Sequence, residues 1–199
     1  MKLVPKMQNR IHGFSMVEDF QRRHWNGLTA DLWTVKCADV AGGYYVGRDP
    51  RLFLLLGQSG NGHPTLKKSL SDIGLAQTLN SNPMSFIPSD MELWVDIHET
   101  QEVTHLDIHF DTATITRRLG NPSYAGLLDI PKLAVSNDRA MVLARLIANE
   151  ILNPCPLNDL YGDSLSLALL IEVLQLPQQH DDAKNGLSNK QLTIVKEFI

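Results

Sequence analysis

Residues 105–110, His-Leu-Asp-Ile-His-Phe, decide the fold class of this chain. Every second residue of the stretch is apolar, and the residues between them are polar. This period of two is typical of a β-strand that packs one face and leaves the other polar. Residues 33–37 and 93–97 repeat the alternation, and residues 51–56 are apolar on both faces. We expect each of these segments to form a strand.

Turn-forming residues separate the expected strands. They are Gly42-Gly43, Asp49-Pro50, Asn61-Gly62, Asn82-Pro83 and Pro88-Ser89-Asp90. Shorter strands are expected at residues 66–69, 75–79 and 84–87. A parallel sheet would require long crossover connections, usually helices, between its strands. Up to about residue 110, the sequence shows no long helical pattern between the expected strands. The sequence therefore predicts an antiparallel β-sandwich or barrel.

The apolar period changes to that of a helix after residue 136. Ser136 or Asn137 is placed to cap a helix that runs to about Leu152 and ends at Asn153-Pro154. A second helix is expected over about residues 158–175. The predicted fold class is thus mainly β followed by α, with an antiparallel helix pair and a further terminal helix.

The second helix is apolar on nearly every side between residues 165 and 174. Such a helix must be covered on more than one face. The cover is either the first helix and sheet of the same chain or a partner subunit, and the sequence leaves both open. The residues predicted to contact a partner are Leu160, Leu167, Leu170, Ile171 and Leu174.

The last part of the chain begins with a polar linker at residues 177–187. Ser188 and Gln191 form a capping box that starts a helix over residues 188–199. No capping glycine or proline follows this helix. We expect it to be the first element of a further domain, and the alternative is a frayed terminal helix.

Composition limits the class of protein. The chain has 199 residues, of which 43% are hydrophobic and 20% charged, and this is typical of a globular domain. Its longest apolar runs have five residues, too few for a membrane span, and its beginning lacks a secretory signal. The chain has two cysteines, which do not form a disulfide framework, so we expect it in the reducing cytoplasm. The net charge of −4 argues against strong nucleic-acid binding by these residues alone.

Candidate chemistry is sparse. His105, Asp107 and His109 share one strand face and form a conceivable metal set, but a solvated or cavity-lining face has the same pattern. Residues 57–62 are glycine-rich and lack the Gly-Lys-Ser/Thr ending of a phosphate loop, so they predict a hairpin loop. No triad or acid–base pair is recognisable. We expect neither catalysis nor a bound metal or cofactor.

A small organic ligand is the stronger expectation. Tryptophan side chains and one charged anchor are typical walls of a ligand pocket, and the alternative is that they fill the core. The candidate ligand-binding residues are Trp33, Arg51, Trp94, His105 and His109.

Several stretches together resemble the N-terminal half of AraC-type transcription regulators. The stretches are residues 25–27 (Trp-Asn-Gly), 43–45 (Gly-Tyr-Tyr), 52–56, 86–90 (Phe-Ile-Pro-Ser-Asp), 106–111 and 158–165. Residues 186–192, Gly-Leu-Ser-Asn-Lys-Gln-Leu, are similar to the entry into the DNA-binding domain of that family.

The resemblance implies a division of the chain. It implies a cupin-like β sensing domain at residues 1–130, a helical dimerisation segment at 131–176, the linker at 177–187, and the first helix of a truncated helix-turn-helix domain at 188–199. The implied partners are a small-molecule effector or a protein signal, a second copy of the chain, and DNA through the missing domain. Metal-binding cupins carry a His-x-His run on an early strand, and residues 48–52 contain no histidine.

The leading hypothesis is therefore the effector-sensing and dimerisation part of a transcription regulator. One alternative is a small cupin-type metalloenzyme, motivated by His105, Asp107 and His109. Another is a dimerisation module without a ligand, motivated by the apolar helix at residues 165–174.

Overall fold

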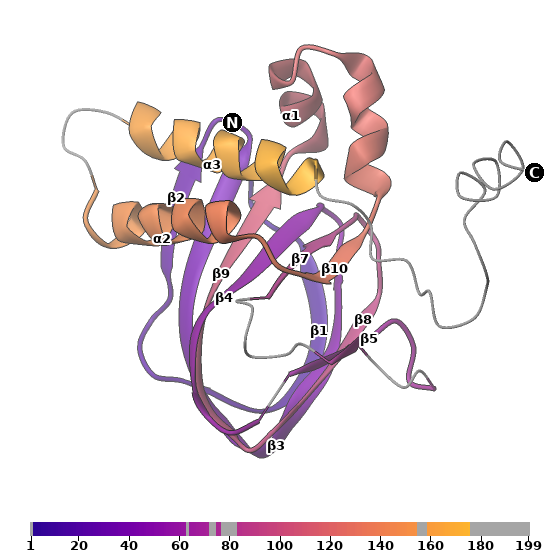
Figure 1. Cartoon of the computed structure of the whole chain (residues 1–199), viewed down its shortest axis with the longest axis vertical. Helices are drawn as coiled ribbons and strands as arrows, with labels where there is room; N and C mark the ends of the chain where they lie inside the picture. Colours follow the sequence, from indigo (N-terminus) through magenta and orange to yellow (C-terminus); the bar gives the residue numbers. More distant parts are fainter. Residues whose placement is uncertain (1, 63, 72–74, 77–82, 155–158, 176–199) are drawn as a thin grey trace, which may run out of the picture.

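The computed structural model describes residues 2–62, 64–71, 75–76, 83–154 and 159–175 (Figure 1). The strands are β1 (Met7–Met16), β2 (Gln21–Trp25), β3 (Leu28–Gly47), β4 (Arg51–Gly60), β5 (Thr65–Lys67), β6 (Leu75–Ala76), β7 (Met84–Ile87), β8 (Leu93–His98), β9 (Thr100–Phe110) and β10 (Lys132–Val135). The helices are α1 (Thr112–Arg118), the 3-10 helix η2 (Pro122–Asp129), α2 (Asp138–Leu152) and α3 (Leu160–Leu174). The predicted fold class, mainly β followed by α, is confirmed.

The strands form one antiparallel, barrel-like sheet with the order β10-β7-β4-β9-β3-β8-β5-β6. The long strand β3 holds the sheet together, because its first half pairs with β2 and β9 and its second half pairs with β1 and β8. The two ends of the sheet, β10 and β6, come close to each other. Figure 1 shows the resulting curved walls around a common interior.

The expected turn at Gly42-Gly43 is wrong, because both residues lie inside β3. A Cβ on Gly42 would lie 2.2 Å from the carbonyl oxygen of Val95, and one on Gly43 would lie 2.3 Å from that of Arg10. Gly43 also has a φ of +148°. The two glycines therefore let three strands approach each other and do not reverse the chain.

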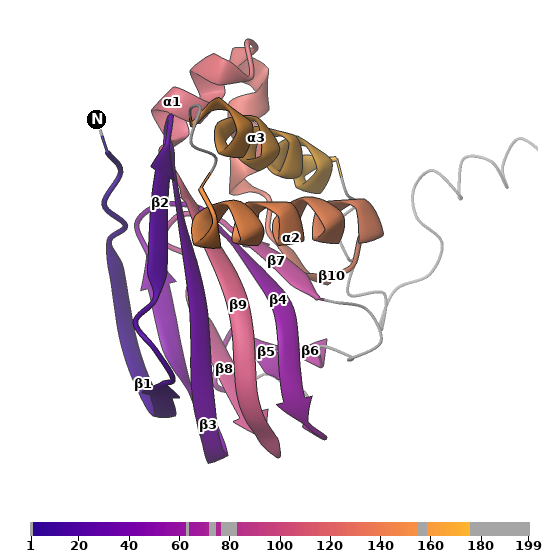
Figure 2. The same ribbon diagram turned by 90° about the vertical axis from the view of Figure 1, so that its left-hand side faces the viewer.

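The main hydrophobic core lies on the outer face of the barrel, beneath the helices. One row of this core is Ala30–Ile108–Leu52–Phe86 across β3, β9, β4 and β7. Figure 2 shows α2 and α3 lying across this face of the sheet. Ala144 and Ile147 of α2 are buried against it. Because β10 extends the sheet to Val135, and the helices share this core, residue 130 does not separate two packed units.

The helix pair follows the sequence prediction closely. Asn137 caps α2 by accepting a hydrogen bond from the backbone N–H of Ala140 at 3.0 Å, and the helix ends at Leu152. Leu170 and Leu174 of α3 are 0% and 6% exposed in the core of the same chain, so they are not available to a partner subunit, and this part of the predicted interface is corrected. None of the described helices is long and apolar enough to span a membrane. The predicted linker and terminal helix lie outside the described residues.

Strands β1 and β2 and helix α1 were not anticipated. Strand β2 reads Gln-Arg-Arg-His-Trp and shows no alternation, and most of β1 is exposed, so neither carries a clear apolar pattern. Helix α1 has only seven residues and is capped by Asp111, which accepts from the N–H of Thr114 at 2.7 Å. Short or exposed elements leave little periodic signal in a sequence.

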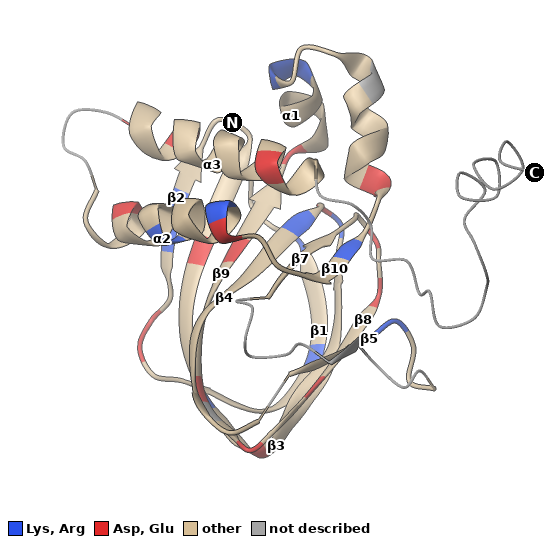
Figure 3. Cartoon of the chain, in the orientation of Figure 1, with Lys and Arg blue, Asp and Glu red and all other residues tan. Residues whose placement is uncertain are grey.

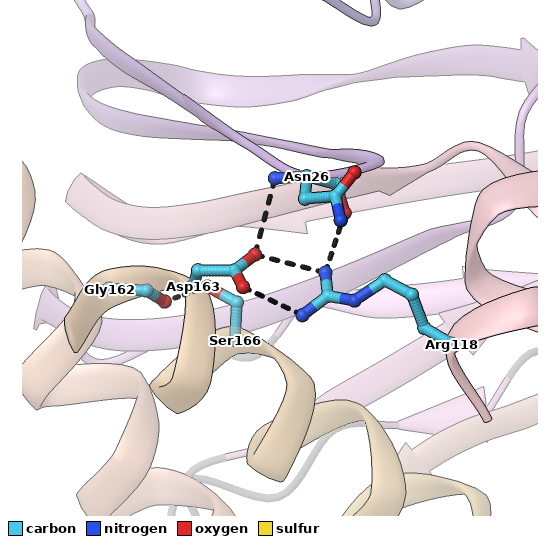
Figure 4. A network of polar contacts seen from close by, with 5 residues as sticks. All are labelled: Asn26, Arg118, Gly162, Asp163 and Ser166. Carbon is cyan, nitrogen blue, oxygen red and sulfur yellow. Dashed lines mark hydrogen bonds and ion pairs between the residues drawn. The ribbon is translucent and has the colours of Figure 1, made fainter. Parts of the chain in front are cut away.

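A polar network joins the barrel to α3 (Figure 4). Arg118 donates to both carboxylate oxygens of Asp163 at 2.9 and 2.8 Å, and its Nη1 also donates to the carbonyl of Asn26 at 2.5 Å. The backbone N–H of Asn26 donates to Asp163 at 3.2 Å. Beside this network, Gly162 lies against the indole of Trp25, where a Cβ would come within 2.4 Å of the ring. Helix α3 is therefore held to the turn between β2 and β3.

Replacing Arg118 with alanine should lower the free energy of unfolding by about 2 kcal/mol, because the partly buried carboxylate of Asp163 loses a two-point ion pair. Urea denaturation of the parent chain and the variant measures the change. Arg117→Ala is the matched control, because Arg117 is exposed in the same helical turn. Equal losses in the two variants would show that the network contributes nothing specific.

Candidate functional site

Polar side chains gather on the interior face of the barrel. Three interior rows cross β3, β9 and β4, namely Thr29–His109–Arg51, Asp31–Asp107–Phe53 and Trp33–His105–Leu55. These residues alternate along each strand with the apolar residues that pack beneath the helices. The same three strands therefore carry the helix-facing core on one side and the polar interior on the other.

The barrel interior holds a cavity of about 100 Å³. This space is sufficient for several water molecules or one small organic molecule. Most of its walls are apolar, and the side chains with polar groups are Tyr45, Arg51, Ser85, His105 and Asp107. The apolar lining residues include Phe14, Phe53, Leu55, Leu66, Ile87 and Leu93. A largely apolar pocket with a few convergent polar groups is the usual form of a small-molecule site.

Arg51 and Asp107 form the centre of the polar region. The Nη1 atom of Arg51 lies 3.5 Å from Oδ1 of Asp107, and Nε2 of His105 lies 3.6 Å from Oδ2. Both charged side chains are buried, with 8% and 12% of their surface exposed. The guanidinium of Arg51 also lies over the ring of Tyr45, 5.7 Å from its centroid.

Several atoms of this region have no hydrogen-bond partner among the described residues. They are Nε of Arg51, Oδ1 of Asp107, Nδ1 of His105 and Nδ1 of His109. Burying a polar atom without a partner costs free energy, and most buried polar atoms in folded proteins are paired. Three of the four atoms belong to side chains that line the cavity, Arg51, His105 and Asp107, so these side chains are candidates for contact with a bound molecule.

The charges of the interior are balanced. Burial raises the pKa of Asp107, but the facing imidazole of His105 and the guanidinium of Arg51 lower it by more, to about 2. Asp31, opposite Asp107, has its own cation, because Arg22 donates to its two oxygens at 2.6 Å each. Burial lowers the pKa of His109 despite the opposing charge of Asp107, which favours the neutral imidazole.

Aromatic rings extend from the cavity along the interior face. Phe53 contacts His105, with ring centroids 5.1 Å apart, and Trp33 lies nearly parallel to His105 at 6.3 Å. Phe20 stacks on Trp33 at 4.2 Å. These rings fix the position of the His105 imidazole from both sides, so its free Nδ1 atom is held in a defined place.

The N-terminal segment reaches the same end of the interior. Thr29 donates its hydroxyl to the carbonyl of Leu3 at 2.7 Å and contacts Nδ1 of His24 at 3.0 Å. The sulfur of Met7 lies 4.0 Å from Nη1 of Arg51. The beginning of the chain therefore packs close to the polar region of the cavity.

The five predicted ligand residues have different outcomes. Arg51 and His105 line the cavity. Trp33 and His109 lie on the same interior face of the sheet, but they do not line the cavity. Trp94 lies outside the interior cavity, because its neighbours Leu93 and Val95 line the cavity while its own ring lies against Tyr44, at a centroid distance of 5.1 Å. On a strand, adjacent side chains point to opposite faces, so Trp94 points away from the cavity.

Sequence reasoning missed most of the wall residues, among them Tyr45, Phe53 and Ser85, and named Asp107 for a metal or a cavity-lining face without including it among the ligand residues. The alternation in β9 places Asp107 between two predicted ligand residues, so that signal was available. Phe53 and Ser85 lie in runs that are apolar on both faces or very short, where the period of two is lost. Only their pairing across β4 and β7 shows that they share a row.

The predicted metal alternative receives no support from the geometry. In the described part of the chain, no three His, Cys, Asp or Glu side chains are arranged to hold one ion together. His105 and His109 are four residues apart on β9, which separates them by about 13 Å along the strand. In addition, the guanidinium of Arg51 occupies one side of Asp107 and would repel a cation.

Comparison with known proteins found no family model, no curated protein and no solved structure that matches the chain. The geometry of the cavity and of the helix pair is therefore the basis of the functional argument.

The stability of the protein should fall below about pH 4 through Asp107. The folded carboxyl has a pKa of about 2 and the ordinary value is 3.8, so the unfolded chain binds more protons between these pH values. Stability therefore rises with pH in this window, and acidification to pH 2 should remove about 2 kcal/mol. Urea denaturation at several pH values between 2 and 5 measures this change. The free energy of unfolding should rise more steeply with pH in the parent than in Asp107→Asn. Equal slopes would contradict this role of Asp107.

Proposed function

We propose that the chain is the effector-sensing and dimerisation part of a transcription regulator of the AraC type. In this proposal a small molecule binds inside the barrel, and the helix pair contacts a second copy of the chain. DNA is bound by a further domain beyond Ile199. Among the residues coloured in Figure 3, basic and acidic side chains are interspersed, which supports placing the DNA-binding role elsewhere.

One observation carries the proposal: strands β3, β4 and β9 form both the wall of the cavity and the floor beneath the helices. Leu52 and Leu54 belong to the core beneath the helices, and Arg51 and Phe53, which alternate with them, line the cavity. Close-packed interiors transmit strain, so a ligand that shifts these strands also shifts the helices. A ligand with different affinity for two helix arrangements would change their populations.

The exposed face of the helix pair supports the dimerisation part. Val142 and Leu146 of α2 are 57% and 39% exposed, and Tyr161 and Ile171 of α3 are 47% and 39% exposed. Leu167 is half-buried, and Leu160 is 65% exposed. Large apolar side chains exposed on both helices are typical of a surface that contacts another protein.

Replacing Ile171 with aspartate should convert a dimer to a monomer, because a buried charge at the interface has no partner. Sedimentation equilibrium should show a dimer for the parent and a 22.2 kDa species for the variant, with little change in melting temperature. Val40→Asp is the control, because Val40 is 57% exposed on β3 and distant in sequence from the helices. A parent chain that stays at 22.2 kDa at high concentration would refute the dimer.

The assignment to a transcription regulator is tested by the gene sequence that follows the codon for Ile199. We expect the codons that follow Ile199 to encode two helix-turn-helix units. A stop codon directly after Ile199, or a following domain of another kind, would overturn this assignment while leaving the cavity available for other roles.

A further inference from the structure

We infer that the ligand of the barrel cavity is a small uncharged molecule, with one hydrogen-bonding head group and an apolar body of about one six-membered ring. The inference rests on the proposed sensing function and names the chemical class of its effector. Three features support it: the charges of the interior, the unpaired atoms, and the walls of the cavity.

The fixed charges around the cavity cancel. Arg51 faces Asp107 across 3.5 Å, and Arg22 forms a two-point ion pair with Asp31. An anionic ligand at Arg51 would lie beside the carboxylate of Asp107, and a cationic ligand at Asp107 would lie beside the guanidinium. Either ligand would leave a net charge in a buried site, where an uncompensated charge is costly. An uncharged ligand preserves the balance.

The unpaired atoms describe the head group. Arg51 Nε can only donate a hydrogen bond, and the ionised carboxylate oxygen Oδ1 of Asp107 can only accept one. The guanidinium and the carboxylate are close together, so the ligand needs a donor and an acceptor within one functional group. A carboxamide or a hydroxyl group has this arrangement. The free Nδ1 of His105 provides a third position, as donor or acceptor according to its tautomer.

The walls and the volume describe the rest of the molecule. Phe53, Leu55, Ile87 and Leu93 contribute apolar surface and no hydrogen-bonding side chain. A free sugar, with hydroxyl groups around its whole ring, would lose hydrogen bonds to water against these walls. The cavity of about 100 Å³ is smaller than a cavity of roughly 150 Å³ that binds benzene. One ring with one polar head is therefore the upper limit of the size that the site accepts.

Four molecules of nearly equal size test the inference: benzamide, benzoate, benzamidinium and toluene. They share one ring and differ in the charge and hydrogen bonding of the head group. Each is titrated at pH 7 into the whole chain, with isothermal titration calorimetry and protein amide NMR shifts as readouts. We expect benzamide to bind at least tenfold more tightly than each of the other three. The NMR shifts should map to β3, β4 and β9.

The double variant Arg51→Met/Asp107→Leu locates the binding. It replaces the charged pair with apolar side chains and should abolish the preference for benzamide over toluene. If this variant does not fold, Ser85→Ala is titrated with the same four molecules in its place. Ser85 lines the cavity without belonging to the ion pair. NMR shifts that fall outside the barrel strands, or an unchanged preference in the double variant, would overturn the assignment to this cavity.

The outcomes separate this inference from the proposed function. Tighter binding of benzoate or benzamidinium would overturn the neutral ligand class and leave the sensing function standing. Tighter binding of toluene would overturn the hydrogen-bonding head group. Absence of binding by all four would overturn the inferred size and class, and the proposed function would then depend on the dimer and the gene sequence.

Discussion

Replacing Arg51 with methionine should lower the free energy of unfolding by about 3–5 kcal/mol at pH 7. The variant leaves the carboxylate of Asp107 buried, with 12% of its side chain exposed, and removes its nearest cation. The charge of Arg51 contributes to the low pKa of Asp107, so the pKa of that carboxyl should rise in the variant. Urea denaturation at pH 7 measures the loss, and NMR titration of the carboxyl measures the pKa.

The matched control for Arg51→Met is the double variant with Asp107→Leu. Replacing both members of a buried ion pair with apolar side chains of similar volume is often neutral or stabilising, because no charge remains buried. We therefore expect most of the lost stability to return. A double variant that is less stable than Arg51→Met alone would show that Asp107 supports the fold independently of Arg51.

Replacing Gly42 with alanine should destabilise the protein by about 3 kcal/mol, the upper part of the range for forced overpacking. The new Cβ would lie 2.2 Å from the backbone oxygen of Val95, so β3 and β8 would have to move apart. Loss of stability measured by urea denaturation, together with changed amide shifts in β8, would support this result.

Gly57→Ala is the control for Gly42, because Gly57 also lies within a strand and a Cβ there meets nothing within 4 Å. Alanine loses less conformational entropy on folding than glycine, so Gly57→Ala should be neutral or stabilise the protein by up to about 1 kcal/mol. Similar losses at both positions would mean that the close approach of β3 and β8 is not the cause.

Much of the fold was predictable because its signals are local. The alternation in residues 105–110 predicts β9 from neighbouring residues alone, and Asn137 with Asn153-Pro154 predicts both ends of α2. The candidate site was predictable in part for the same reason. Arg51 and His105 were identified by residue type and period, whereas the period alone did not show which face of β8 carries Trp94.

The sequence by itself determined that a strand-rich part precedes a helical part, the polar face of β9 and the two helices that follow the sheet. These features depend on the period of side chains along one segment. Tertiary structure alone decided that Gly42 and Gly43 lie inside a strand, that Leu170 and Leu174 are buried, and that Arg51 meets Asp107. These outcomes depend on strand register and helix packing between distant residues. One residue of register reverses the face on which every side chain of a strand lies, so no local pattern can specify them.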